Sequence, residues 1–122
     1  GGTLAVEMSV LSELTGNDTY CQFADKAQLA LQKRRTPIGL FGGHIDNKSG
    51  AWKTKIGGLG AGIDSFYEYQ FKMYLLWGRR DYWDIFLDNK KSIDRYFVRQ
   101  NWLVDCNINS GVPTSSHLES LA

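Results

Sequence analysis

The sequence predicts an all-α fold made of two helical hairpins, each followed by a short extended segment. Three observations carry this prediction. Apolar residues recur at helical spacing in four stretches of the chain, glycine-rich or turn-forming segments separate these stretches, and runs of alternating hydropathy follow each pair. The order helix, helix, extended segment therefore occurs twice, and we expect the extended segments to form short β-hairpins.

The first predicted hairpin occupies roughly the first 35 residues. We expect a helix over residues 3–15, with Gly16 as its C-terminal stop, and a second helix that is capped by Asn17 or Asp18 and ends at Thr36-Pro37. The apolar faces that should pack in this hairpin contain Leu4, Leu11 and Leu14 in the first helix and Tyr20, Ala24, Ala27 and Leu31 in the second.

The second half of the chain repeats this organisation. Residues 38–62 predict a β-hairpin, because turn formers fill residues 46–50 and hydropathy alternates from Trp52 to Ile56. A third helix is expected at about 63–77, a fourth at about 80–99, and a strand at 102–109. Residues 116–122 look like the start of another helix, which predicts that the chain is a fragment of a larger domain.

Composition excludes several classes of protein. The 122 residues carry 14 basic and 13 acidic side chains, a net charge of +1, which is too little for nucleic-acid binding. No apolar run approaches the roughly 20 residues of a transmembrane helix, so no membrane span is expected. Cys21 and Cys106 form no metal-binding or redox spacing and are either free or paired, while His44 and His117 lack any metal-ligand spacing.

Glu7 is the first candidate for chemistry. It lies between Leu4 and Leu11 in the heptad-spaced stripe, which directs a carboxylate toward the apolar side of its helix. Burying that carboxylate without a partner would be costly. The alternative is a place at the edge of the stripe, near the helix start, where the helix dipole favours negative charge.

Asp64 and Glu68 form the second candidate. Their i,i+4 spacing puts both carboxylates on one face of the third helix. A purely structural interpretation makes Asp64 a cap and pairs Glu68 with Lys72 on a solvated ridge. Against this, the helix is rich in aromatic side chains, and carboxylates beside aromatic rings are typical of sites that cleave sugars. The aromatic neighbours are Phe66, Tyr67, Tyr69, Phe71 and Tyr74.

Three segments carry recognisable motifs: Leu4-Ala5-Val6-Glu7-Met8, Leu11-Ser12-Glu13-Leu14-Thr15-Gly16 and Gly60-Ala61-Gly62-Ile63-Asp64-Ser65-Phe66-Tyr67-Glu68-Tyr69. Together they resemble glycoside hydrolase family 47, the class I α-mannosidases. Within the family, Ile38-Gly39-Leu40, Gly43-His44-Ile45-Asp46 and Ser116-His117-Leu118-Glu119-Ser120-Leu121 are most similar to the ER degradation-enhancing α-mannosidase-like proteins. The resemblance implies that residues 1–122 are an interior fragment of one catalytic domain, with about two helical hairpins of an (α/α)7 toroidal barrel.

The resemblance also implies an activity. Family members are inverting, Ca²⁺-dependent hydrolases that remove α-1,2-linked mannose from high-mannose N-glycans in the secretory pathway, and the degradation-enhancing group works in the ER lumen. By resemblance, Asp64 is a catalytic carboxylate, and Glu7 and Glu68 line the substrate pocket, so we expect the three to converge. The general acid, a further glutamate and the calcium-binding threonine fall outside this chain, which leaves it without metal ligands of its own.

One departure from the family pattern qualifies this interpretation. Gly62 stands where the ER-resident processing mannosidase has arginine, so that enzyme's branch preference does not transfer. An alternative function is a catalytically inactive module that recognises mannose glycans on misfolded glycoproteins, and a generic helical-repeat scaffold is a third class.

The sequons at Asn17 and Asn47 point toward a secretory compartment.

Overall fold

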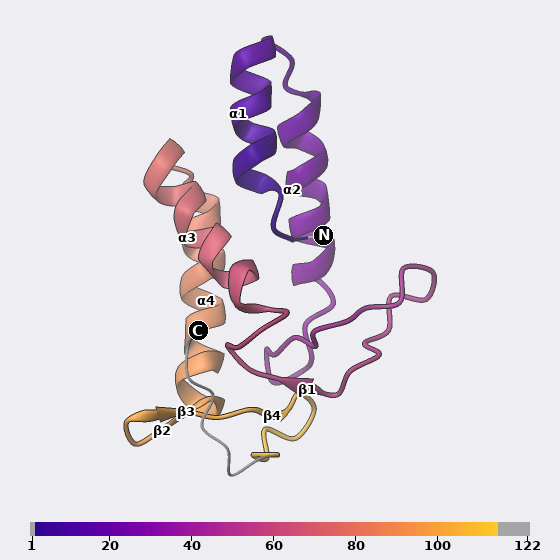
Figure 1. Ribbon diagram of the computed structural model, residues 1–122, viewed down its shortest axis with the longest axis vertical. Coiled ribbons are helices and arrows are strands. Elements are labelled where there is room, and N and C mark those ends of the chain that lie inside the picture. The colour runs from indigo at the N-terminus through magenta and orange to yellow at the C-terminus, as the bar shows by residue number, and fades with distance from the viewer. Residues whose placement is uncertain (1, 115–122) are drawn as a thin grey trace. The chain divides into compact units, whose positions relative to one another are not determined.

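A computed structural model of the chain describes residues 2–114, which contain four α-helices and four two-residue β-strands (Figure 1). The predicted helical fold class is confirmed. The helix expected over residues 116–122 lies outside the described residues. The chain divides into two compact units, the first comprising the chain up to Lys33 with Ser65–Phe86 and the second comprising Arg34–Asp64 with the chain from Leu87 onward.

The first unit begins with the predicted helical hairpin. Helix α1 spans Ala5–Thr15 and helix α2 spans Thr19–Gln32, and the two lie side by side (Figure 1). Gly16 ends α1 in the left-handed conformation with φ 67°, which glycine adopts without steric cost. The side chain of Asn17 accepts a hydrogen bond of 3.0 Å from the Thr19 N–H, whereas the Asp18 side chain makes no capping bond.

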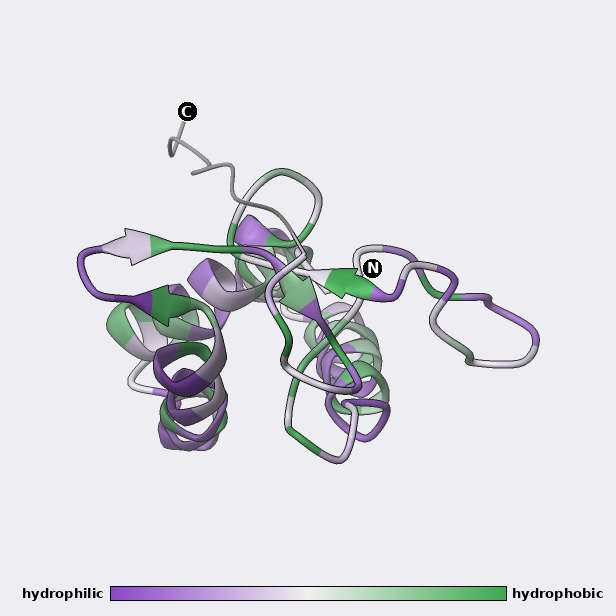
Figure 2. Ribbon diagram, turned by 90° about the horizontal axis from the view of Figure 1, so that it is seen from below, coloured by the Kyte–Doolittle hydropathy of each residue, from purple (hydrophilic) through white to green (hydrophobic). Residues whose placement is uncertain are grey.

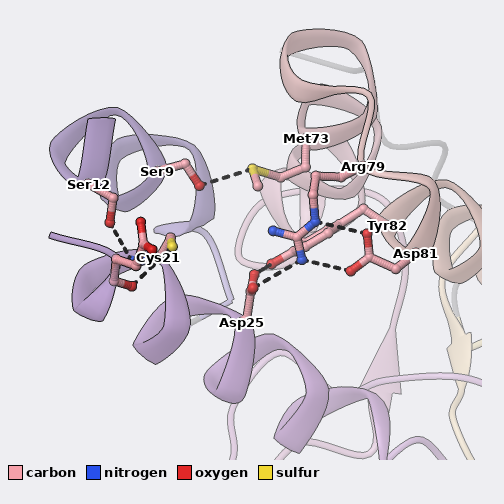
Figure 3. Close-up of polar contacts among 9 residues, drawn as sticks. Ser9, Ser12, Cys21, Asp25, Met73, Arg79, Asp81 and Tyr82 are labelled. Atoms are coloured by element: carbon pink, nitrogen blue, oxygen red, sulfur yellow. Dashed lines mark hydrogen bonds and ion pairs between the residues drawn. The ribbon is translucent and has the colours of Figure 1, made fainter. Parts of the chain in front are cut away.

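The packing face of α1 differs from the predicted leucine stripe. Its buried residues are Ala5, Ser9 and Ser12, while Leu14 is 80% exposed and Leu4 is 48% exposed. Small side chains let two helix backbones approach closely, and the Ser12 hydroxyl accepts a 3.0 Å hydrogen bond from the Cys21 N–H of α2 (Figure 3). The Ser9 hydroxyl on the same face donates to Met73 Sδ of α3 at 3.8 Å, so this polar face is buried and the stripe of Leu4, Leu11 and Leu14 is not what packs in this hairpin.

Helices α3 and α4 complete the core of the first unit. Helix α3 spans Asp64–Trp77 and helix α4 spans Arg80–Tyr96, with Gly78 between them at φ 64°. The buried core combines one residue from each helix with three partly buried neighbours: Ala5, Ala24, Met73 and Tyr82, packed by Val6, Met8 and Trp77. A ladder of aromatic rings also links α3 to α4 and consists of Phe71, Tyr74, Trp83 and Phe86.

The β-structure of the second unit differs from the prediction in its pairing. Strand β1 (Ile56–Gly57) pairs antiparallel with β4 (Cys106–Asn107), far along the chain. The predicted hairpin over 38–62 is reduced to one antiparallel bridge between Ile45 and Trp52. Its turn is closed by Asp46, whose carboxylate accepts the N–H groups of Lys48 and Ser49.

The end of the fourth helix and the following strand were also predicted wrongly. Helix α4 ends at Tyr96, and β2 (Val98–Arg99) pairs with β3 (Trp102–Leu103) through a hydrophilic turn, drawn in purple in Figure 2. Gln100 adopts a positive φ of 54° in this turn, which a helix interior does not accommodate. The expected single strand over 102–109 is therefore split between two sheets, since β3 joins β2 and β4 joins β1.

The core of the second unit collects around β4. Its most buried apolar residues are Leu40, Phe41, Phe97, Cys106 and Ile108. Both cysteines carry free thiols, so the pairing that the sequence leaves open is absent. Among residues 2–114, no helix is both long and apolar enough to cross a bilayer.

Candidate active site

A glycine-rich segment, residues 57–62, precedes α3 and sets where the helix begins. The pairing of β1 with β4 holds Gly57, and a side chain at Gly58 would collide with the carboxylate of Asp105. Gly62 then takes φ 100°, a conformation that side chains other than glycine rarely adopt. The Asp64 N–H reaches the Gly60 carbonyl at 3.3 Å, so the chain turns directly into the helix.

Asp64 is the first residue of α3 and is exposed. The helix dipole stabilises a negative charge in this first turn. Glu68 follows one turn later on the same helix and is also exposed. Asp64 is the last residue of the first segment of the second unit, whereas Glu7 and Glu68 belong to the first unit. The convergence of Asp64 with the other two carboxylates therefore stays a prediction.

Glu68 forms the ion pair that the structural interpretation predicts. The Lys72 ammonium lies 2.6 Å from Glu68 Oε1 in an i,i+4 arrangement, and both side chains are about half exposed. This hydrogen bond raises the pKa of Lys72, which therefore stays charged. Exposed pairs of this kind contribute little to stability, about 0.3–0.5 kcal/mol.

Glu7 has a partner from α3. The Tyr69 hydroxyl donates a 2.5 Å hydrogen bond to Glu7 Oε1, at the short end of the range for a phenol bonded to a carboxylate. The bond to Glu7 raises the pKa of Tyr69, which keeps the donor proton in place. Glu7 itself is exposed, as the edge-of-stripe interpretation expects.

These contacts join into one cluster, which we call the α1–α3 acidic cluster and define as Glu7, Glu68, Tyr69 and Lys72. The Lys72 ammonium lies 5.5 Å from the centroid of the Tyr69 ring, so the two pairs touch. The structure thus brings Glu7 and Glu68 together within the first unit. Sequence reasoning treated Tyr69 only as an aromatic neighbour, because a contact across 62 residues leaves no periodic signal.

A second polar network in the first unit escaped sequence reasoning altogether (Figure 3). Arg79 Nη2 lies 3.0 Å from Asp25 Oδ2 and 2.7 Å from Asp81 Oδ2, and the Tyr82 hydroxyl donates to Asp25 Oδ1 at 2.7 Å. The bond to Arg79 lowers the pKa of Asp81, and burial together with the Asp25 carboxylate raises the pKa of Tyr82. The network ties α2 to the turn between α3 and α4, so its role is to hold the hairpins together.

Two cavities lie outside the acidic cluster. One of about 190 Å³ adjoins the Arg79 network and is lined by Gln28, which is 2% exposed and whose amide atoms have no hydrogen-bond partner among residues 2–114. The other, of about 360 Å³, lies in the second unit beside the ion pair of Arg35 with Asp88 and is lined by Lys91 and Arg95. Neither contains a carboxylate that the sequence predicts to be functional.

The candidate ligands for a metal ion are spread over the chain. In the described part of the chain, no three His, Cys, Asp or Glu side chains gather as the ligands of an ion would. His44 is exposed at the edge of its turn.

Exposed carboxylates beside aromatic rings on paired helices agree with the class that the motifs suggest, the helical-barrel glycosidases. Comparison with known proteins agrees, because the model of glycosyl hydrolase family 47 matches residues 1–120. The chain belongs to glycosyl hydrolase family 47.

Individual relatives agree with this assignment. The chain is 41% identical to alpha-mannosidase I MNS4 of Arabidopsis thaliana over 110 residues, which cover 90% of this chain and 18% of that protein. It is 38% identical to ER degradation-enhancing alpha-mannosidase-like protein 1 of Schizosaccharomyces pombe over 122 residues, covering 98% of this chain and 16% of that protein. The chain thus spans less than a fifth of the length of these two relatives.

A solved structure supports the fold. The alpha-1,2-mannosidase from Trichoderma reesei superposes with a TM-score of 0.68 at 28% identity, covering 89% of this chain and 25% of that chain. The helical hairpins described above therefore correspond to part of an (α/α)7 barrel.

Proposed function

We propose that this chain forms part of the catalytic domain of an inverting α-1,2-mannosidase that trims high-mannose N-glycans in the ER lumen and acts in ER-associated glycoprotein degradation. The observation that carries the proposal is the family match over residues 1–120, a span that contains Glu7, Asp64 and Glu68. The remainder of the catalytic machinery, including the general acid, belongs to the rest of the whole protein.

Each carboxylate has a role in this proposal. Asp64 is a catalytic carboxylate, and inversion requires a second carboxyl roughly 6.5–9.5 Å away, with a water between the two. That second carboxyl comes from another segment. Glu7 and Glu68 bind mannose hydroxyl groups, since ionised carboxylates accept hydrogen bonds from them. Ca²⁺ is the proposed cofactor of the whole protein, with its protein ligand outside these residues.

The test uses the full-length protein with a high-mannose N-glycan and with an α-1,2-linked mannose disaccharide. We expect release of mannose, first as the anomer opposite to that of the substrate, and loss of release when a chelator removes Ca²⁺. NMR of the first product distinguishes inversion from retention. Retention of configuration would contradict the proposal. So would cleavage of other glycosidic linkages without any cleavage of the α-1,2-mannosidic bond.

One observation favours the alternative of a glycan-recognition module without turnover. Glu68 is committed to an ion pair with Lys72, which suits a group that binds better than one that exchanges protons. Under this alternative the full-length protein binds high-mannose glycans in calorimetry, while no mannose is released over long incubation. The Asp64→Asn variant would then bind glycan as well as the unchanged protein does.

A further inference from the structure

The proposed function assigns two carboxylates to substrate binding, and each of them has its own partner on α3. Tyr69 bonds Glu7 across two helices at 2.5 Å, and Lys72 bonds Glu68 along α3 at 2.6 Å. The contact of the Lys72 ammonium with the Tyr69 ring makes the two pairs one unit. All four residues belong to the first unit of the chain.

The contacts leave the carboxylates able to bind a ligand. A carboxylate offers about four acceptor positions, and each of these two bonds occupies one position on one oxygen. Glutamate side chains lose considerable rotamer freedom when a ligand fixes them. A partner that fixes them beforehand removes that cost from binding.

Tyr69 is suited to this task because of its own environment. Its ring is half-buried on α3 and has only two rotatable bonds, so the position of its hydroxyl follows from the position of the helix. Lys72, by contrast, is flexible, and its two contacts with Glu68 and the Tyr69 ring restrict it. The rigid group thus anchors Glu7, and the flexible one links the second carboxylate to the same anchor.

We propose that Tyr69 and Lys72 are positioning residues that hold Glu7 and Glu68 oriented toward the hydroxyl groups of a bound α-mannoside. The inference rests on the proposed function, since it assigns both carboxylates to substrate. It adds the groups that act through them. Neither Tyr69 nor Lys72 needs to touch the reacting atoms.

The first test is Tyr69→Phe in the full-length protein. This change removes the hydroxyl and keeps the ring that packs beside Lys72. We expect KM for the α-1,2-linked mannose disaccharide, or Kd if the protein binds without turnover, to rise about 10-fold, the scale of one lost charge-assisted hydrogen bond. We expect kcat to change less than twofold and Tm to stay within about 2 °C. Tyr20→Phe on α2, in the same unit of the chain, removes a hydroxyl that has no role in the proposed site, so it is the control and leaves KM unchanged.

A double-mutant cycle shows whether Tyr69 acts through Glu7. If it does, Tyr69→Phe has little further effect on KM in a Glu7→Gln background, because the oriented charge is already gone. A merely structural role for the hydroxyl would give additive effects in the two backgrounds. Additivity would overturn the inference.

Lys72 gives an independent arm should Tyr69→Phe fail to fold. Lys72→Met removes the partner of Glu68 and is expected to raise KM several-fold, whereas Lys72→Arg keeps the charge and restores most of the loss. The pair of Lys90 with Asp94 on α4 has the same i,i+4 spacing and the same 2.6 Å separation. Lys90→Met is therefore the matched control and leaves KM unchanged.

The outcomes separate the inference from the function on which it rests. If the unchanged protein neither cleaves nor binds α-mannosides, the proposed function and the inference both fall. If it does either, and Tyr69→Phe and Lys72→Met bind substrate as it does, the inference alone is refuted. A selective rise in KM with the non-additive cycle supports it.

Discussion

Replacing Asp64 by asparagine tests the catalytic assignment most directly. The change keeps the size and shape of the side chain and removes its charge, which an oxocarbenium-like transition state and its attacking water require. Deleting a positioned acid, base or electrostatic group costs on the order of 10²-fold in rate or more. A 10²-fold loss corresponds to about 2.7 kcal/mol of transition-state stabilisation.

The structure limits what the same change does to folding. Asp64 is exposed in the first turn of α3, where its charge interacts with the helix dipole for about 0.3–1 kcal/mol. Asparagine is itself a good residue at a helix start. We therefore expect the free energy of unfolding to fall by less than about 1 kcal/mol while turnover falls by at least 10²-fold.

The assay measures mannose release from a high-mannose glycan and thermal unfolding on the same full-length preparations. Asp84→Asn is the control, because Asp84 is an exposed carboxylate near the start of α4 that forms a long ion pair of 3.7 Å with Arg80 and has no role in the proposed site. This control is expected to retain activity. Turnover in Asp64→Asn equal to that of the control would reduce Asp64 to a helix cap and refute the reasoning.

Three further predictions concern the described residues outside the acidic cluster. Arg79→Met breaks a partly buried network and should lower the free energy of unfolding by about 1–3 kcal/mol, between the values for exposed and buried ion pairs. Arg80→Met, which removes an exposed ion pair next to it, should lower it by less than about 0.5 kcal/mol. Chemical denaturation of both variants measures the difference. Hydrogen bonds from the Ser49 and Lys48 N–H groups and from Lys53 lower the pKa of Asp46 to about 2, so its favourable contacts persist above the unfolded value of 3.8 and are lost as pH falls toward 2. An NMR titration that finds an Asp46 pKa near 4 would contradict this. Burial raises the pKa of the Cys106 thiol to about 11, so alkylation of the native protein at pH 8 should label the half-exposed Cys21 and spare Cys106, as peptide mass spectrometry would show.

Local sequence determined where the four helices begin and where α1 and α3 end. Gly16 and Gly78 both take the left-handed conformation that stops a helix, with φ 67° and 64°, and both stops are predicted from the residue type alone. The same locality explains the four helices, whose bounds the periodicity of apolar residues predicts closely except at two ends: α2 ends at Gln32, before the predicted stop at Thr36-Pro37, and α4 ends at Tyr96, before the predicted 99. Beyond α4, the positive φ at Gln100 belongs to a hairpin turn that periodicity does not reveal.

Sequence also identified the family and the three carboxylates, because short motifs carry that information without any knowledge of contacts. The match to glycosyl hydrolase family 47 over residues 1–120 confirms the family. The roles of Glu7, Asp64 and Glu68 remain predictions for the variants above to test. The pairing of Glu68 with Lys72 followed from i,i+4 spacing, which is again local.

Only the tertiary structure decided which surfaces meet. Periodicity marks a stripe as apolar but does not say which stripe a neighbour covers, so α1 packs through Ala5, Ser9 and Ser12 while Leu14 stays exposed. Strand β1 finds its partner in β4 some 50 residues away, and Tyr69 finds Glu7 across 62 residues. Such contacts depend on how backbones approach in space, and the free energy that selects them comes from burial and hydrogen bonding between segments that carry no mark of each other in the sequence.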